Sequence, residues 1–348
     1  LWLRTLELRR IQPSQLRNRS LSVPGWDENL MLAAVVKIPT LTALDRSFPR
    51  SDEIALMQHA RLQTFTCVNL DRAAAAVLLA TPMAQSLREL RCACDIYDLV
   101  SLLRLPKLAT LEVVLTGNYG EAQDAISAAS SSVVSLQLMA EGTNALPPRV
   151  SIALLSRVRM PKLRSLALRG VMLDEPVCKL LAALTGVSLK LDILHHEPGL
   201  LDLLAPPLLL HHLSFGSGEA KDALREIHRF PLLQSMRIES TDEIKHADGW
   251  KTALRPLHSL KHLRWLQWAG SLHADTLHAL PATITRLSLL CDYQTIPVFD
   301  ALRVDGCLPN LTVLETLSVH DNSGSFSQLA LAIRPTLTAR KWHWRRLV

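Results

Sequence analysis

Closely spaced cysteine and histidine residues are the first features of this sequence that could carry chemistry. Cys92-Ala93-Cys94 brings two thiols together, as a pair of metal ligands or a redox pair would need. His258 and His262 are four residues apart, so on a helix both imidazoles would share one face. Neither pair has further ligands nearby in the sequence, and a structural zinc ion needs a full set of them. We therefore interpret the thiols as core residues and the histidines as surface residues.

Motifs of catalysis or nucleotide binding are missing from the sequence. It has no P-loop and no GxGxxG, HExxH or GxSxG pattern. Gly216-Ser217-Gly218 lacks the further glycine and the lysine of a phosphate-binding loop, so we interpret it as a plain turn. We expect a protein that is not an enzyme, with no cofactor, no metal ion and no small-molecule substrate.

The C-terminal residues combine cations with indole rings. No acidic residue follows Asp321, so much of the net charge of +6 lies in this tail. Stacking on tryptophan together with attraction by arginine and lysine is typical of contact with nucleic acid or another anionic surface. The candidate residues are Arg340, Lys341, Trp342, Trp344, Arg345 and Arg346. The alternative is a cap, whose tryptophans cover the apolar end of the core.

A short apolar phrase recurs along the chain and predicts the elements that would position these residues. Its first, fourth and sixth residues are apolar, as Leu163, Leu166 and Leu168 are. The phrases start about 26 residues apart on average. Their first residues are Leu3, Leu41, Leu62, Leu87, Leu108, Val133, Leu163, Leu184, Leu210, Leu233, Leu263, Ile284 and Leu314.

Each phrase predicts a strand with one buried and one exposed side. Alternate side chains of a strand face opposite sides, so the fourth and sixth residues would point inward and the third, fifth and seventh outward. Trp268 would then be buried and Trp265 exposed. The fifth residue is polar in twelve of the thirteen phrases, which supports this register. The fifth residues are Glu7, Asp45, Thr66, Arg91, Glu112, Gln137, Ala167, Ser188, Ser214, Arg237, Gln267, Ser288 and Ser318.

The sequence segments between the phrases are predicted to form helices. Asp174-Glu175-Pro176 is a helix start, and apolar residues follow it at helical spacing up to Leu184. Residues 219–227 and 325–333 have the same pattern. Many phrases are preceded by proline, which ends the helix before the strand.

This alternation resembles the leucine-rich-repeat superfamily, in its helix-bearing branch with the ribonuclease-inhibitor-like and F-box-associated repeats. The resemblance covers residues 1–322 in about thirteen irregular repeats. It implies an α/β solenoid, or horseshoe, with parallel strands on the concave face and helices on the convex face. Residues 323–348 are predicted to form a capping helix and a basic tail.

A rigid concave face predicts a non-catalytic protein–protein interaction module or a scaffold subunit of a multi-subunit complex. The residues expected to contact a protein partner are Arg91, Glu112, Arg237, Glu239, Trp265 and Gln267. Two alternatives stay open. One is an F-box-type substrate receptor of a ubiquitin ligase, which needs an F-box before Leu1. The other is an RNA or ribonucleoprotein component that binds through the basic tail.

The sequence predicts an intracellular and cytoplasmic protein without a membrane partner. No apolar run reaches the roughly 18 residues that a membrane-spanning helix needs. Six cysteines without a clustered disulfide pattern favour a reducing compartment. The chain is already inside a phrase at Leu3, so we expect that a further N-terminal segment precedes it.

Overall fold

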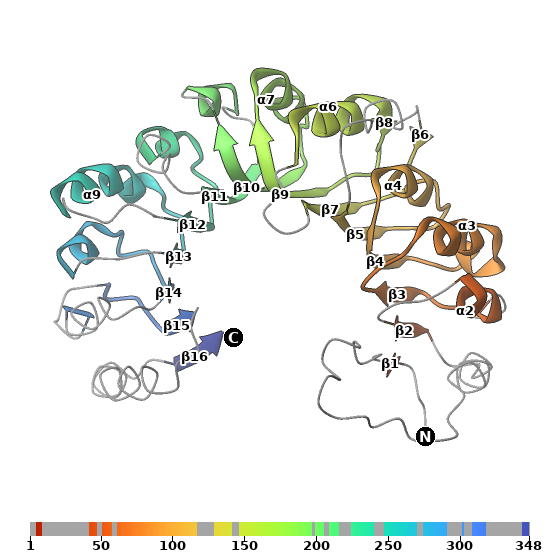
Figure 1. The fold of residues 1–348 in the computed structure, drawn as a ribbon. Helices are drawn as coiled ribbons and strands as arrows, with labels where there is room; N and C mark the ends of the chain where they lie inside the picture. The colour runs from red at the N-terminus through yellow and green to blue at the C-terminus, as the bar shows by residue number, and fades with distance from the viewer. Residues whose placement is uncertain are drawn as a thin grey trace. The chain divides into compact units, whose positions relative to one another are not determined.

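A computed structural model of the chain shows short strands alternating with helices (Figure 1). The chain divides into two units, Leu1–Arg169 (unit 1) and Gly170–Val348 (unit 2), and the division falls within one strand. The structure describes residues 5–8, 42–46, 51–57, 61–116, 129–140, 146–196, 199–204, 209–215, 224–239, 247–269, 274–290, 301–302, 308–317 and 343–347.

Unit 1 contains a row of strands, each parallel to its neighbours. In order they are β1 (Thr5–Leu8), β2 (Ala43–Arg46), β3 (Thr64–Cys67), β4 (Glu89–Cys94), β5 (Thr110–Leu115), β7 (Ser135–Ala140) and β9 (Ser165–Leu173). A separate pair consists of β6 (Ala129–Ser130) and β8 (Val158–Arg159).

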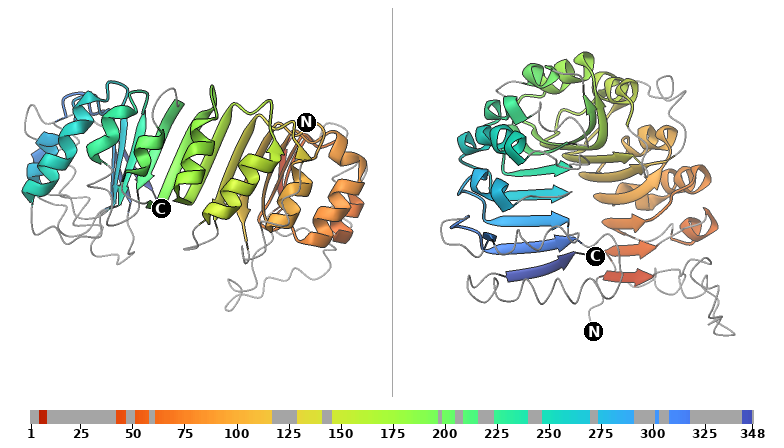
Figure 2. Two further views of the ribbon diagram at one scale, coloured as in Figure 1. Left: turned by 90° about the horizontal axis from the view of Figure 1, so that it is seen from above. Right: turned by 60° about the vertical axis from the view of Figure 1, so that its left-hand side comes forward.

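Helices cover one side of the unit 1 strands (Figures 1 and 2). They are α2 (Ser51–Leu56), α3 (Arg72–Ala80), η2 (Pro82–Gln85), α4 (Ile96–Leu102) and α6 (Pro148–Arg157). Aspartates start two of them. Asp71 accepts a hydrogen bond from the amide of Ala74 at 2.8 Å, and Asp95 accepts one from the amide of Asp98 at 2.9 Å. We call the other side of the strands, which carries Arg91 and Glu112, the open face of unit 1.

Unit 2 repeats this arrangement. Its parallel strands are β10 (Ser188–His196), β11 (Leu209–Phe215), β12 (Ser235–Glu239), β13 (Trp265–Ala269), β14 (Arg286–Leu290), β15 (Val313–Leu317) and β16 (His343–Leu347). Its helices are α7 (Glu175–Ala182), η3 (Leu200–Leu204), η4 (Ile227–Arg229), α9 (Ala247–Leu254), η5 (Arg255–Ser259) and η6 (Ala274–Ala279). The strand side that carries Trp265 and Arg286 is the open face of unit 2.

The strand register confirms most of the predicted phrases. Leu111 at the fourth position pairs with Leu90 on one side and Leu136 on the other, and all three are buried. Along β5, buried residues alternate with half-buried ones, as a strand with a core on one side requires. The helix predicted after Asp174 is also confirmed, because Asp174 accepts a hydrogen bond from the amide of Val177 at 2.9 Å.

The register predicted for two phrases is wrong. In β10 Ser188 pairs with Leu209, and Asp192 takes its place beside Ser214. The predicted and observed fifth positions are four residues apart, because Val187, Leu189, Leu191 and Ile193 alternate as buried residues and fit more than one register. A one-residue irregularity also lies between Leu189 and Lys190.

In β15, Leu314 pairs with Leu287 and is the fourth residue of its phrase, not the first. Glu315 therefore occupies the fifth position. Ser318, which we predicted there, lies outside the described residues. Leucines at 311, 314 and 317 repeat at equal spacing, so the phrase fits two registers.

The predicted boundary at residue 322 is not where the strand row ends. Residues 343–347 form β16, which pairs with β15 in parallel. This part of the segment 323–348 is thus a strand of the sheet rather than a tail. Residues 323–342 lie outside the described part of the chain. Among the helices that the structure describes, none is long and apolar enough to span a bilayer.

Candidate partner-binding faces

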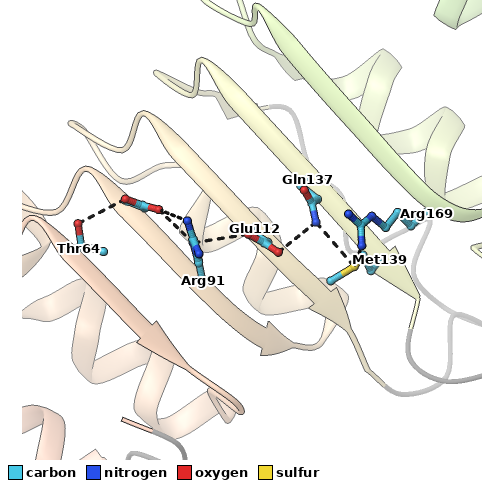
Figure 3. A network of polar contacts seen from close by, with 7 residues as sticks. Thr64, Arg91, Glu112, Gln137, Met139 and Arg169 are labelled. Atoms are coloured by element: carbon cyan, nitrogen blue, oxygen red, sulfur yellow. Dashed lines mark hydrogen bonds and ion pairs between the residues drawn. The ribbon is translucent and has the colours of Figure 1, made fainter. Parts of the chain in front are cut away.

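A ladder of polar side chains crosses the open face of unit 1 (Figure 3). Thr64 on β3 donates to Glu89 on β4 at 3.4 Å. Arg91 lies between two carboxylates, with its Nη2 2.8 Å from Glu89 and its Nε 3.5 Å from Glu112. Gln137 on β7 donates to the other oxygen of Glu112 at 3.0 Å. Four adjacent strands thus contribute to one connected network.

The ladder contributes little to the stability of the fold, and its main effect is to order the side chains on this face. The Arg91 side chain is 54% exposed, and exposed ion pairs contribute about 0–1 kcal/mol each. However, each side chain in the ladder is held by a neighbour on the next strand, so the face has a defined shape before any partner binds.

An apolar row runs beside the ladder on the same face. Ala93, Val114 and Met139 pair in register at the seventh position of their phrases. Val68 adjoins them, because its carbonyl accepts a hydrogen bond from the amide of Ala93 at 3.2 Å. The Val68 side chain is 54% exposed, and the other three are half-buried. Arg169 ends the row, with its Nη1 3.4 Å from the sulfur of Met139.

The open face of unit 2 contains a cluster around Trp265. The indole Nε1 donates to the hydroxyl of Ser288 at 2.9 Å. The Arg286 guanidinium lies over the indole ring, with its Cζ 4.3 Å from the centroid. The His212 ring lies 6.4 Å from the indole and its Nδ1 is 2.7 Å from the hydroxyl of Ser235. A half-buried tryptophan held by its neighbours is the kind of residue that anchors protein interfaces.

Glu315 on the neighbouring strand β15 fixes the position of this cluster. Its side chain is 0% exposed. Arg286 reaches both carboxylate oxygens, since its Nε donates to Oε2 at 2.9 Å and its Nη2 lies 2.7 Å from Oε1. Ser288 also donates to Oε2, at 2.6 Å. The buried carboxylate therefore sets the position of the guanidinium that covers Trp265.

Comparisons with known proteins add no assignment of function. No protein-family model matches the sequence, and no curated protein matches it. One solved structure, described as "Crystal structure of TLR13-ssRNA13 complex", is similar with a TM-score of 0.38 and 14% sequence identity. The match covers 90% of this chain and 47% of the other, so this chain spans about half the length of that protein.

The fold is decided by the strand register instead. In the described residues, successive repeats add one parallel strand next to the last and bury the fourth residue wherever its side chain is described, and helical segments connect several of the strands. Each unit is a leucine-rich-repeat solenoid.

The structure brings some of the predicted contact residues together. Arg91 and Glu112 interact directly, and Trp265 and Gln267 lie on β13 as half-buried residues of one face. Arg237 on β12 pairs in register with Gln267. The strand includes Glu239, but its side chain lies outside the described residues.

The basic tail residues are only partly described. Trp344, Arg345 and Arg346 belong to β16, where their backbones pair with Leu314, Glu315 and Thr316. Arg340, Lys341 and Trp342 lie outside the described residues, so nucleic-acid contact through the tail stays a prediction.

Sequence reasoning missed the Arg286–Glu315 pair. Arg286 is the third residue of its phrase, and Glu315 reaches the fifth position only in the corrected register. With that register, the sequence alone would have placed an arginine and a glutamate on adjacent strands of one face.

The interpretation of Cys92 and Cys94 as core residues is confirmed. Both thiols are free and buried. A hydrogen bond with Cys67 and burial hold the pKa of Cys92 well above its usual value, and a hydrogen bond with Cys92 and burial do so for Cys94. Such thiols stay protonated and are poor nucleophiles. Across the described residues, no group of three or more histidine, cysteine or acidic side chains could hold a metal ion.

Asp98 is a buried acid that should weaken unit 1 at neutral pH. Asp98 is a buried residue in the first turn of α4, and its Oδ2 has no hydrogen-bond partner among the described residues. Burial, followed by repulsion from Asp95, raises the pKa of Asp98 to about 6. An unfolded aspartate has a pKa of about 3.9. The folded state therefore holds this proton more tightly, and the contribution of Asp98 to stability falls as pH rises from about 4 to about 6.

We expect Asp98→Asn to stabilise the protein at pH 7.5 by on the order of 1–2 kcal/mol, because asparagine carries no charge to bury. The gain should become small near pH 4, where Asp98 is protonated in the folded state and about half protonated in the unfolded state. Urea unfolding followed by circular dichroism between pH 4 and 7.5 measures this difference. Glu175→Gln, at an exposed position of α7, is the control. A hydrogen bond with Lys179 lowers the pKa of Glu175, so loss of this carboxylate should not stabilise the protein at pH 7.5. A gain from Asp98→Asn that does not change with pH would contradict the assignment.

Proposed function

We propose that this chain is a non-catalytic protein-binding module that holds a partner against the open faces of its strands. The proposal is supported above all by the ladder from Thr64 to Gln137, whose side chains are already bonded to one another on an exposed face. Ordering a flexible side chain on binding costs about 0.5–1.5 kcal/mol, and a pre-ordered face avoids much of that cost.

The role within a complex is part of the same proposal. A stack of repeats presents a broad surface and needs no moving part, which suits a subunit that positions other proteins. On unit 2 the contact residues proposed are Arg237, Glu239, Trp265 and Gln267, with the Trp265 cluster as the anchor. On unit 1 they are Arg91 and Glu112.

Reversal of one charge in the ladder tests the proposal. Glu112→Lys removes the carboxylate that Arg91 and Gln137 share and places a second cation beside Arg91. It should remove the partners that the wild-type protein retains in a native purification, with at least a tenfold loss in their amount. The control is Glu175→Lys, which makes the same change of charge on a helix of unit 2. Circular dichroism should show both variants folded.

The partner set distinguishes the alternatives. Partners lost in Glu112→Lys but kept in Glu175→Lys support binding through the open face of unit 1, and an identical set in both variants excludes it. A cullin and its adaptor among the partners would select the F-box-type receptor. Loss of all partners after nuclease treatment would favour the RNA alternative. Reversal of both Arg237 and Glu239 tests the corresponding face of unit 2.

A further inference from the structure

We infer that the open face of unit 1 binds a cationic amphipathic helix of its partner. The inference rests on the proposed function, because it assumes that this face binds protein, and it adds the chemistry of the bound segment. Two features of the face carry it: an excess of carboxylates in the ladder and the apolar row beside them.

The charges of the ladder do not balance. Asp45, Glu89 and Glu112 are the carboxylates at the outward positions of β2 to β9 in the described residues, and the two cations there are Arg91 and, at the end of the apolar row, Arg169. Arg91 is shared between Glu89 and Glu112, whose side chains are 30% and 32% exposed. Both carboxylates are held in place by Thr64 or Gln137 and remain accessible to solvent. A lysine or arginine placed over this ladder would therefore meet net negative charge that is already oriented.

The apolar row gives the rest of the segment a place to pack. Val68, Ala93, Val114 and Met139 lie on four neighbouring strands. Neighbouring strands are about 4.8 Å apart, so the row extends over roughly 14 Å. A helix repeats an apolar side chain at i, i+3 or i+4, and i+7, which covers about 10 Å along its axis. Two turns of a helix lying across the strands would thus match the row.

The two rows also have the right separation. Residues two apart in a strand are about 6.6 Å apart, so Arg91, Glu112 and Gln137 at the fifth position run parallel to the apolar row at the seventh, and Glu89 lies two residues further along β4. A helix is about 10 Å wide with its side chains. One helix can therefore place apolar side chains on Val114 and Met139 while lysines on its flank reach Glu89 and Glu112.

Labelled synthetic peptides test this inference on the full chain. The probe is a helical peptide of about 16 residues with leucine at i, i+3, i+4 and i+7 and lysine along one flank. A second peptide has glutamate in place of every lysine, and a third has the lysine peptide's composition in scrambled order. Fluorescence anisotropy at low and moderate salt gives the affinities. We expect the lysine peptide to bind at least tenfold more tightly than either other peptide.

Protein variants locate the binding. Glu89→Gln together with Glu112→Gln should weaken binding of the lysine peptide about tenfold, and Val114→Ser should weaken it severalfold. Glu175→Gln on α7 removes an exposed carboxylate elsewhere and should leave binding unchanged. Equal binding of the lysine and glutamate peptides, or no loss in the ladder variants, would overturn the inference. Absence of any binding below about 1 mM would also overturn it. The proposed function is judged separately, by whether Glu112→Lys loses its native partners.

Discussion

Arg286→Ala is expected to destabilise unit 2 by roughly 3 kcal/mol or more. Glu315 is 0% exposed, and Arg286 is the cation that reaches both of its oxygens. Without Arg286 the buried carboxylate would lose the guanidinium that contacts both of its oxygens, which costs more than loss of an exposed ion pair. Trp265 would also lose the guanidinium that covers its ring.

The measurement is urea unfolding combined with hydrogen exchange of β13, β14 and β15. Hydrogen exchange is needed because repeats can open without global unfolding, so a single transition midpoint would mix the two units. Glu315→Gln is the matched variant, since its amide keeps the size of the side chain and carries no charge. We expect it to lose clearly less stability than Arg286→Ala. Equal stability of Arg286→Ala and the wild type would show that the pair does not hold the cluster.

Trp268→Ala should cost about 3–5 kcal/mol, the second large effect. Trp268 occupies the sixth position of its phrase, is fully buried, and packs edge-to-face on Trp250 with ring centroids 4.8 Å apart. Removing the indole would leave a large cavity between β13 and α9.

Two further variants give this prediction its scale. Trp268→Phe keeps an aromatic ring in the core. It also breaks no hydrogen bond of Nε1 among the described residues. Trp268→Phe should therefore destabilise the protein less than Trp268→Ala. Leu232→Ala shortens an exposed leucine of the same unit and should change stability by less than about 1 kcal/mol. A cost for Trp268→Ala as small as that for Leu232→Ala would show that the core register of β13 is incorrect.

Most of the fold could be predicted because one short-range pattern encodes it. In the described residues, the apolar side chain at the fourth position is buried in every strand where the phrase is unambiguous, as Leu90, Leu111 and Leu136 are. The predictions failed where the pattern is degenerate. In β10 a run of alternating buried residues from Val187 to Ile193 fits more than one register, and around Leu314 equally spaced leucines allow two alignments.

The candidate sites were harder to predict because they depend on contacts between repeats. Arg91 and Glu112 could be identified as neighbours, since both phrases are unambiguous and the fifth residues of adjacent strands meet. The buried position of Glu315 follows from packing of the whole layer rather than from its local sequence. The division into two units within β9 has no signal in the sequence, because the phrase at Leu163 is among the clearest in the chain.

The ladder of unit 1 joins residues of successive repeats, which lie 21 to 25 residues apart along the chain. Thr64 and Glu89 are 25 residues apart, and so are Glu112 and Gln137. One repeat therefore contributes one position to each row of the open face. Duplication of a repeat would lengthen each row by one residue, and the existing repeats away from the duplication would keep their contacts with one another. A surface with this construction can change its recognition one position at a time during evolution, while the buried leucines keep the same environment.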